Sequence, residues 1–317
     1  MAGRVLVVGS FNLDHAWSVD ALPAPGATRL ASYASGPGGK GFNQAVAAAR
    51  SGMQATFVTA LGEDAGAVVA RRLADEEGIT LLAETFADAP SGTAGIFVDA
   101  GGRNVIAVAP GANALLSQAH IESLDDALTQ ATVVLAQLEV APAAVERALE
   151  LARAHAAITV LNPAPANAPT TPALLALADV LTPNETEFTG LLGRHGNRSA
   201  DPATLHACTD EALHALCQSL QPATWVITLG GHGAFVSHAP SQLRGDGQAA
   251  YRVPAQAARV VDTTGAGDAF NGALAAALAR SPDGAFADAV KRATRYAAAS
   301  TEVAGAALSM PRLDAEA

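Results

Sequence analysis

The segment 131–161, ATVVLAQLEVAPAAVERALELARAHAAITVL, decides the fold class of this 317-residue chain. It predicts a buried strand at 131–138, a helix at 142–155 and a second strand at 158–161. A strand, a helix and a further strand form a βαβ unit, in which the strands lie parallel and the helix covers one face of the sheet. The segment therefore predicts an α/β protein.

The same alternation continues on both sides of this segment. Strands are expected at 5–8, 55–60 and 225–229, and helices at 43–51, 66–77, 205–220, 268–280 and 286–300. Continuous apolar strands separated by helices are typical of a parallel sheet that is covered on both faces. We therefore expect one doubly wound, mostly parallel sheet flanked by helices.

Two segments interrupt this alternation. Segment 13–35 has no helical period, and segment 93–108 is typical of a hairpin with strands at 95–98 and 105–108. We expect them to pair into a small separate sheet whose unburied face and edges suit a lid or a dimer contact. This divides the chain into a core, 1–11, 36–92 and 109–317, and a lid and dimerisation element, 12–35 and 93–108. Trp17 and Tyr33 in the lid would either stack on a nucleobase or pack within it.

Composition excludes several classes of protein. The net charge is −11 and no basic stretch occurs, whereas a nucleic-acid-binding surface needs positive charge, so we expect no nucleic-acid partner. No apolar run approaches the roughly 18 residues that span a bilayer, and the first run, 5–8, is too short for a signal peptide. Two cysteines, Cys208 and Cys217, cannot form a disulfide framework. We expect a cytoplasmic protein with no membrane partner.

The strongest chemical signal is segment 260–272, VVDTTGAGDAFNG, which runs into an alanine-rich helix. Its glycines allow a ligand to approach the backbone closely, and the unpaired N–H groups of a helix N-terminus favour an anion. Asp268 would then be a base that takes the proton of a hydroxyl attacking a phosphate. The alternative is that Asp268 only caps the helix.

Two common nucleotide-binding motifs are excluded or disfavoured. In 36–41, GPGGKG, Lys40 is followed by Gly41, whereas a Walker loop needs Ser or Thr at that position. Gly265 begins a partial dinucleotide motif, but Phe270 occupies its sixth position and the motif lies late in the chain. A nicotinamide-dependent enzyme is left as a weak alternative.

Polar residues also follow the predicted strands, where open α/β sheets bind their ligands. In 9–14, GSFNLD, Asn12 and Asp14 suit vicinal hydroxyls, or else they form an Asx turn. Asn43 opens the next helix and could reach the same pocket. Glu139 is either an acceptor for sugar hydroxyls or a charge at a helix start.

Two further motifs have both a functional and a structural interpretation. Asn184 and Glu187 lie three residues apart and could hold Mg²⁺ through water, or form a capping box. The segment 228–233, TLGGHG, fits either a nucleotide site or an ordinary hairpin.

Taken together, these motifs resemble the ribokinase family of carbohydrate kinases, of the PfkB type, nearly from end to end. The matching segments, in matching order and spacing, are 9–14, 38–46, 162–165, 182–187, 228–230 and 262–268. The resemblance implies an ATP-dependent kinase that phosphorylates the primary hydroxyl of a pentose, with D-ribose as the first candidate. It also implies that family members dimerise through the lid, so a homodimer is expected.

The resemblance assigns roles position by position. Asp268 would be the base, with an anion hole formed by Gly265, Ala266 and Gly267. The sugar would be bound by Asn12, Asp14, Gly39, Lys40, Gly41, Asn43, Glu139 and Asp268. The ATP site would be lined by Asn184, Thr228, Leu229, Gly230, Gly231, His232, Gly233, Gly267 and Thr294. Glu187 would position Mg²⁺. A monovalent cation, K⁺, would be held, mostly through carbonyl groups, by Asp262, Thr264, Ser300, Val303, Gly305 and Ser309.

The chain departs from the family pattern at three places. Phe42 stands in the sugar-binding turn where alanine is common, Thr294 replaces a commoner Asn or His beside the nucleotide, and Val303 and Ala304 replace a polar pair. The substrate therefore stays open between ribose, another sugar, fructose and a nucleoside. A non-catalytic sugar-binding relative is a further alternative, disfavoured because Asp268 and the glycines beside it are intact.

Overall fold

The computed structural model describes residues 3–239 and 241–312. Its centre is a nine-stranded sheet in the order β13-β12-β11-β10-β9-β8-β1-β4-β5. The strands are β1 (Arg4–Val8), β4 (Gln54–Gly62), β5 (Thr80–Phe86), β8 (Val133–Ala136), β9 (Ile158–Leu161), β10 (Val180–Leu181), β11 (Thr224–Thr228), β12 (Ala234–Ser237) and β13 (Ala250–Val253). Neighbours pair in parallel except β12, which is antiparallel to both β11 and β13. The predicted mostly parallel sheet is confirmed.

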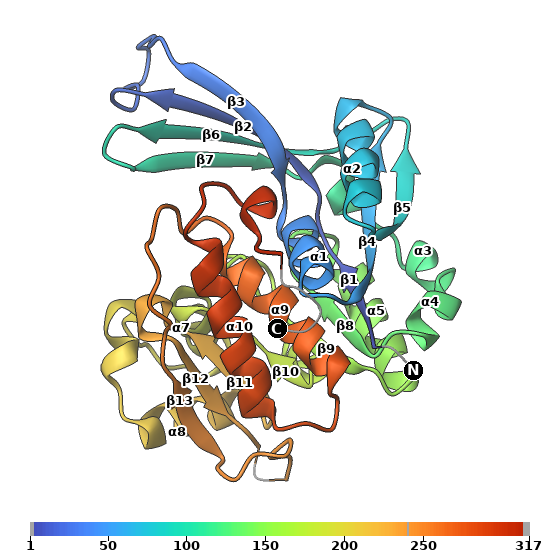
Figure 1. The fold of residues 1–317 in the computed structure, drawn as a ribbon, viewed down its shortest axis with the longest axis vertical. Helices are drawn as coiled ribbons and strands as arrows, with labels where there is room; N and C mark the ends of the chain where they lie inside the picture. Colours follow the sequence, from blue (N-terminus) through green and yellow to red (C-terminus); the bar gives the residue numbers. More distant parts are fainter. Residues whose placement is uncertain (1–2, 240, 313–317) are drawn as a thin grey trace.

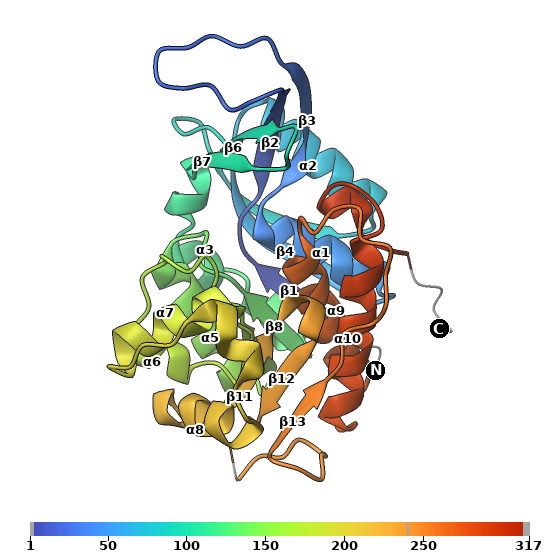
Figure 2. The ribbon, with the colours of Figure 1, turned by 90° about the vertical axis from the view of Figure 1, so that its left-hand side faces the viewer.

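Helices cover both faces of this sheet (Figure 2). One layer consists of α1 (Lys40–Arg50), α2 (Ala65–Glu76), α9 (Ala266–Arg280) and α10 (Phe286–Ser300). The other consists of α3 (Gln118–Glu122), α4 (Asp125–Thr129), α5 (Pro142–Ala154), α6 (Pro172–Ala176), α7 (Glu185–His195) and α8 (Asp210–Leu220). Because side chains alternate along a strand, Val5 and Val7 pack in one core while Leu6 and Val8 pack in the other. No helix in the described ranges is long and apolar enough to cross a bilayer.

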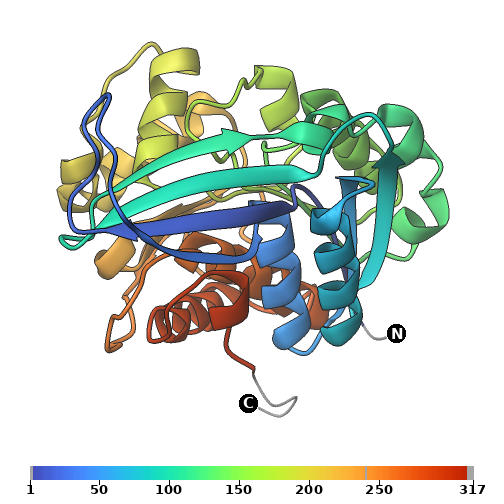
Figure 3. The same cartoon turned by 90° about the horizontal axis from the view of Figure 1, so that it is seen from above.

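A small sheet with the order β3-β2-β6-β7 lies apart from the large one. Its strands are β2 (Asn12–Val19), β3 (Ser32–Gly38), β6 (Gly92–Asp99) and β7 (Asn104–Ala109). It projects over the end of the molecule at which β1 passes into β2 (Figures 1 and 3). The predicted hairpin and the predicted separate sheet are confirmed. β3 runs past the expected limit at residue 35, and the division into core and lid domains stays a prediction.

The chain order places a topological switch point beside β1. From β1 the chain continues to β4 on one side of it, and only later does it form β8 on the other side. The connections therefore leave in opposite directions at the carboxyl ends of β1 and β8, and such switch points are the usual ligand sites of open α/β sheets. The residues that follow these two strands, among them Ser10 and Glu139, meet here.

One predicted helix is wrong. Segment 205–220 is not continuous, since a 3₁₀ helix at Pro202–Ala207 precedes α8, which begins at Asp210. The break arises because the Thr209 hydroxyl accepts a hydrogen bond from the amide of Ala212 and caps α8. Strands β5, β10, β12 and β13 had no clear signal in the sequence.

Candidate active site

Asp268 lies in the first turn of α9, but it does not cap that helix. Gly265 is the N-cap residue, with a positive φ of 75° that favours glycine. Both carboxylate oxygens of Asp268 instead accept hydrogen bonds from α1, from Asn43 Nδ2 and from Gln44 Nε2, each at 2.9 Å. The capping interpretation is therefore wrong.

The electrostatics of Asp268 balance opposing effects. Burial of the carboxylate raises its pKa, while the charge of Lys40 and the two amide donors act in the opposite direction. The amino group of Lys40 is itself mostly buried. Burial opposes its charge, but the carboxylates of Asp268, Glu139 and Glu187 outweigh that effect and raise its pKa. A carboxylate and an ammonium group thus share one site, and perturbed pKa values of this kind cluster at functional sites.

The sugar-binding turn predicted at 38–43 is built on close backbone contacts. The amide of Phe42 donates to the carbonyl of Ser10, which joins the start of α1 to the end of β1. Gly39 has a φ of 87°, and a Cβ built on Gly41 would lie 2.5 Å from the backbone of Gly9. Side chains at these positions would therefore separate the two segments.

Asn12 and Glu139 both face this turn. Asn12 begins β2 and its Oδ1 accepts a hydrogen bond from Asn113 Nδ2 at 3.0 Å, so it belongs to a strand and not to an Asx turn. Glu139 accepts from the Ser10 hydroxyl at 2.6 Å and from the amide of Lys40 at 3.1 Å. The helix that follows, α5, starts only at Pro142, so Glu139 is not a charge in its first turn.

Asp14 carries an unusual carboxyl group. Its burial and the nearby charge of Glu139 raise its pKa to about 7. The group lies against Gly38, because a Cβ built there would be 2.0 Å from Asp14 Oδ2. A partly buried carboxyl with a perturbed pKa is a frequent mark of a functional site.

The departure at Phe42 places an aromatic ring in the hydrophobic core. Its ring is fully buried and packs edge-on against Phe11, with ring centroids 5.3 Å apart, and against Phe57 at 5.9 Å. On a helix, consecutive side chains point in different directions, so Phe42 enters the core while Asn43 faces Asp268.

A cavity of about 440 Å³ lies at the N-terminus of α9, where Ala266 and Gly267 line it. The predicted nucleotide residues that line it are Asn184, Thr228, Gly230, Gly231, Gly233, Gly267 and Thr294. Two predicted residues do not line it: Leu229 is buried in the core, and the ring of His232 stacks on His206 at 4.0 Å. Segment 228–233 connects the antiparallel strands β11 and β12, so the hairpin interpretation is confirmed, and the nucleotide-site interpretation stays a prediction.

Asn184 and Glu187 form the capping box of α7. Asn184 Oδ1 accepts from the amide of Glu187, and Glu187 Oε2 accepts from the amide of Asn184, both at 2.9 Å. Burial raises the pKa of Glu187, against the effects of that amide and of Lys40. Because Asn184 and Glu185 line the cavity, the first turn of α7 places carboxylate oxygens, which suit Mg²⁺, at its border.

The segments predicted to hold K⁺ are joined by hydrogen bonds. Asp262 accepts from the amide and hydroxyl of Thr264 and from the amide of Gly305 at 2.9 Å. Burial raises the pKa of Asp262, but these donors outweigh it and the pKa is low. The hydroxyl of Ser309 donates to the carbonyl of Gly305 at 2.9 Å. The predicted ligands thus lie on two adjacent segments and offer only oxygen atoms, which fits an alkali cation.

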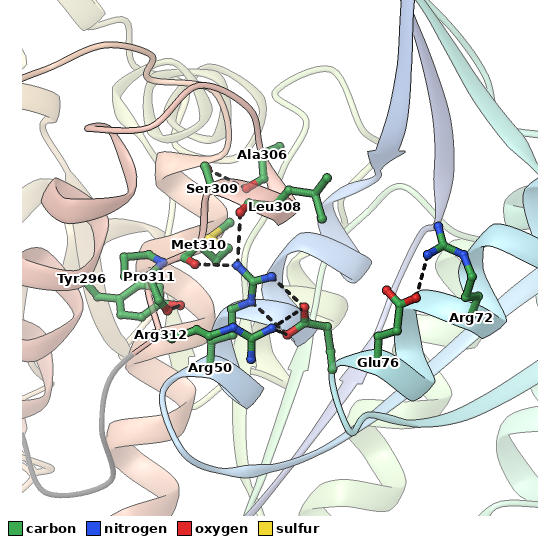
Figure 4. Close-up of polar contacts among 11 residues, drawn as sticks. Arg50, Arg72, Glu76, Tyr296, Ala306, Leu308, Ser309, Met310, Pro311 and Arg312 are labelled. Atoms are coloured by element: carbon green, nitrogen blue, oxygen red, sulfur yellow. Dashed lines mark hydrogen bonds and ion pairs between the residues drawn. The ribbon is translucent and has the colours of Figure 1, made fainter.

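Arg50, at the end of α1, holds the segment that follows α10 (Figure 4). Its Nη1 donates to the carbonyls of Leu308 at 3.2 Å and Met310 at 2.6 Å, and its other nitrogens bond Glu77. The hydroxyl of Tyr296 donates to the carbonyl of Pro311 at 2.7 Å. Helix α1 therefore carries Asn43 near its first turn, and Arg50 in its last turn supports the segment predicted to bind the cation.

Comparison with known proteins agrees with this geometry. The model of the family described as pfkB family carbohydrate kinase matches residues 2–313. The chain belongs to this family. It is 35% identical over 312 residues to the ribokinase of Mus musculus, which covers 98% of this chain and 92% of that protein. Membership makes it a phosphotransferase that acts on a hydroxyl group.

Solved structures of pfkB-type kinases share the whole fold. A ribokinase from Giardia lamblia matches with a TM-score of 0.85 and 29% identity, over 98% of this chain and 96% of that one. A ribokinase from Arabidopsis thaliana complexed with ribose and ATP matches with a TM-score of 0.83 and 28% identity, over 98% and 96%. The ribokinase-like fold class is thereby confirmed.

The pfkB-type site contains residues that the sequence did not single out. Gln44, Gln137 and Asn162 form buried hydrogen bonds around Asp268, and Asn113 holds Asn12. Gln44 and Asn162 lie inside quoted motifs, but no pattern assigned them a task. Trp17 and Tyr33 pack against each other in the small sheet, with ring centroids 5.5 Å apart.

Proposed function

We propose that this protein transfers the γ-phosphate of ATP to the primary 5-hydroxyl of D-ribose and forms D-ribose 5-phosphate. The observation that carries the proposal is the position of Asp268. It lies in the first turn of α9 and accepts a hydrogen bond from Asn43, which opens the predicted sugar-binding helix, while the preceding residue Gly267 lines the 440 Å³ cavity. The Arabidopsis thaliana relative, complexed with ribose and ATP, supports the pairing of these two ligands.

The proposed reaction proceeds in one displacement. Asp268 takes the proton of the sugar hydroxyl as its oxygen attacks the γ-phosphorus, and the bond between that phosphorus and the bridging oxygen breaks to release ADP. The amide of Gly267, at the positive end of α9, would stabilise the charge on the transferred phosphoryl group, whereas the amide of Ala266 donates to the carbonyl of Thr263 at 3.2 Å. The charge of Lys40 lowers the pKa of Asp268 against the effect of burial and so favours the ionised form that a base needs.

Two metal ions fit the proposal. Mg²⁺, when bound, would neutralise charge on the ATP phosphates, and Glu187 would position it through water. K⁺ would lie between segments 262–264 and 300–309, beside the helix N-terminus.

A requirement for a monovalent cation predicts a higher phosphorylation rate when K⁺ replaces Na⁺ at constant ionic strength. Equal rates with the two ions would contradict the cation site.

The proposed function is tested by ADP release from ATP, with Mg²⁺ and K⁺ present, across D-ribose, 2-deoxyribose, fructose and adenosine. We expect the highest kcat/KM for D-ribose. A preference for another substrate would retain the chemistry and overturn the assignment of ribose. Binding of ribose in calorimetry without any ADP release would favour the alternative of a non-catalytic sugar-binding protein.

The close contact between Gly38 and Asp14 gives a first prediction. Gly38→Ala would push the Asp14 carboxylate aside and is expected to raise KM for the sugar about tenfold or more, with little loss of stability, because the displaced group is the end of a side chain. Loss of one hydrogen bond to a charged group corresponds to about that factor. Gly36→Ala, on the same strand with no atom within 4 Å, is the matched control. Equal KM values for the two variants would contradict a role of Asp14 in sugar binding.

The pKa of Asp14 gives a second prediction. If sugar hydroxyls donate to its ionised form, KM for the sugar should fall about tenfold between pH 6 and pH 8, because the ionised fraction rises through a pKa of about 7. Glu139→Gln removes a charge that raises this pKa, so the fall should move to lower pH. Steady-state kinetics at constant ATP measures both, and a flat KM in the unaltered protein would refute the assignment.

We also propose that a second copy of the chain covers the small sheet. Val105, Ile106 and Val108 on β7 are each more than half exposed, and such an apolar strand is normally covered by a partner. Sedimentation velocity tests this proposal, with a dimer as the expected result and a monomer at micromolar concentration as the contrary one.

A further inference from the structure

Gln44 contacts the proposed base directly, yet the proposed chemistry assigns it no role. It is fully buried on α1 and follows Asn43. Its Nε2 donates to Asp268 Oδ1 at 2.9 Å, while Asn43 donates to the other carboxylate oxygen. Each oxygen of the base is therefore held by a different amide from the same helix.

The amide of Gln44 is held in one orientation by its neighbours. Gln137, fully buried after β8, donates through Nε2 to Gln44 Oε1 at 2.6 Å. The acceptor end of Gln44 is thereby occupied, so its donor end must face Asp268 and the Oδ1 of Asn162, 3.2 Å away. A reversed amide would place its oxygen against the carboxylate.

The hydrogen bonds continue from the base to the turn that precedes it. Asn162 Nδ2 donates to the carbonyl of Thr182 at 2.8 Å, and the Thr182 hydroxyl donates to Asn271 Oδ1 at 2.5 Å. Asn271 Nδ2 then donates to the carbonyl of Gly267 at 2.8 Å. The network thus fixes both the carboxylate of Asp268 and the adjacent peptide.

We propose that Gln44 is a positioning residue that orients the Asp268 carboxylate and keeps it ionised, with its own amide fixed by Gln137. The proposal rests on the proposed role of Asp268 as base. A donor aimed at a carboxylate favours the ionised form, and such bonds strengthen one another in a buried network.

The charged groups around Asp268 define what its titration should show. Lys40 on α1 lowers its pKa, whereas Glu139 after β8 raises it, and Glu187 on α7 is also coupled to it. Burial raises the pKa more than any of these groups. Loss of the Gln44 donor removes one of the few effects that oppose burial, so a smaller fraction of the base is ionised at a given pH.

The test compares Gln44→Met, Gln137→Met and their double variant. Methionine keeps the length of the side chain and removes both the carbonyl oxygen and the NH₂ group of the amide. We expect Gln44→Met to lower kcat about 10- to 100-fold, as for loss of a hydrogen bond to a charged group, and to shift the acidic limb of the kcat profile to higher pH, with KM for ATP unchanged. Gln137→Met should act in the same direction but less, and the double variant should lose less than the product of the two single losses.

Gln218→Met is the matched control. Gln218 lies on α8 and its Nε2 donates to the hydroxyl of Ser237 at 3.0 Å, outside the site. Its substitution should leave kcat and the acidic limb as in the unaltered protein. A folded Gln44→Met variant with an unchanged acidic limb would overturn the proposal, as would strictly multiplicative effects of the two site variants.

A second measurement is independent of sugar phosphorylation. The folded pKa of Asp268 lies above its unfolded value, so the stability that this group contributes falls as pH rises toward the folded pKa. The difference in unfolding free energy between the unaltered protein and Asp268→Asn, followed against pH, reports that fall. In the Gln44→Met background, this fall in stability should extend to higher pH. An identical pH range in the two backgrounds would overturn the proposal.

If Gln44→Met does not fold, Gln137→Met is compared instead. An absence of kinase activity in the unaltered protein would defeat the proposed function and not this result.

Discussion

Asp268→Asn is expected to lower kcat about 10³-fold while the protein stays folded. A general base contributes about 10²–10⁴-fold, and the amide cannot accept the hydroxyl proton. The substitution preserves the shape of the side chain. It also places an NH₂ group opposite one of the two amide donors, but Asn43 Oδ1 has no hydrogen-bond partner among the described residues, so Asn43 can turn over and accept.

The stability of the variant provides an internal check. Burial raises the pKa of Asp268 above its value in the unfolded chain. At a pH above the pKa in the folded protein, the ionised carboxylate therefore opposes folding. At pH 8 the neutral amide should therefore unfold at the same temperature as aspartate or at a higher one. Lys40 retains Glu139 and Glu187 as carboxylate partners.

Steady-state phosphorylation and thermal unfolding measure these two effects. Asp201→Asn is the matched control, because Asp201 caps the 3₁₀ helix at Pro202–Ala207 and asparagine caps equally well. The control should retain full activity. A kcat of Asp268→Asn within threefold of the unaltered protein would exclude Asp268 as the base.

Gly272→Ala is expected to destabilise the protein by about 3 kcal/mol, the upper range for overpacking a core. A Cβ built on Gly272 would lie 2.4 Å from the carbonyl oxygen of Gln44 and 2.5 Å from Ala47 Cβ. Both atoms belong to α1, so the two helices must move apart. That movement also withdraws Asn43 and Gln44 from Asp268, and kcat should fall together with stability.

Thermal unfolding measures this effect as a fall of about 4–5 °C, because the unfolding entropy is about 2.1 cal/mol/K per residue and the chain has 317 residues. The matched control is Gly193→Ala on α7, where no atom lies within 4 Å of the added Cβ. Alanine has the higher helix propensity, so the control should gain up to about 1 kcal/mol. Similar unfolding temperatures for the two variants would show that α1 and α9 are not in close contact at Gly272.

The fold class follows from local patterns that a sequence displays directly. Buried strands and helices alternate along the chain, and the segment at 260–272 combines glycines with a helix start. The matched motifs then indicated the family, which the comparisons confirm. Patterns of this kind can be recognised in a sequence because each one depends on residues that are neighbours in the chain.

The sequence by itself also predicted the small sheet, the mostly parallel arrangement of the strands and the positions of α5, α9 and α10 to within two residues. It did not predict which way the Phe42 side chain points, and it predicted α8 and the preceding 3₁₀ helix as one continuous helix. In both cases the outcome depended on packing: Phe42 fills a space between Phe11 and Phe57, which come from other parts of the chain.

Only the tertiary structure decided which polar groups surround Asp268. Gln44 precedes it by 224 residues, and Gln137 and Asn162 follow different strands of the sheet. Buried amides are placed by whichever partner completes their hydrogen bonds, and that partner is brought near by the sheet order and by the packing of α1 against α9. Because such partners have no fixed spacing along the chain, a sequence pattern names the base, and the folded chain selects the side chains that hold it.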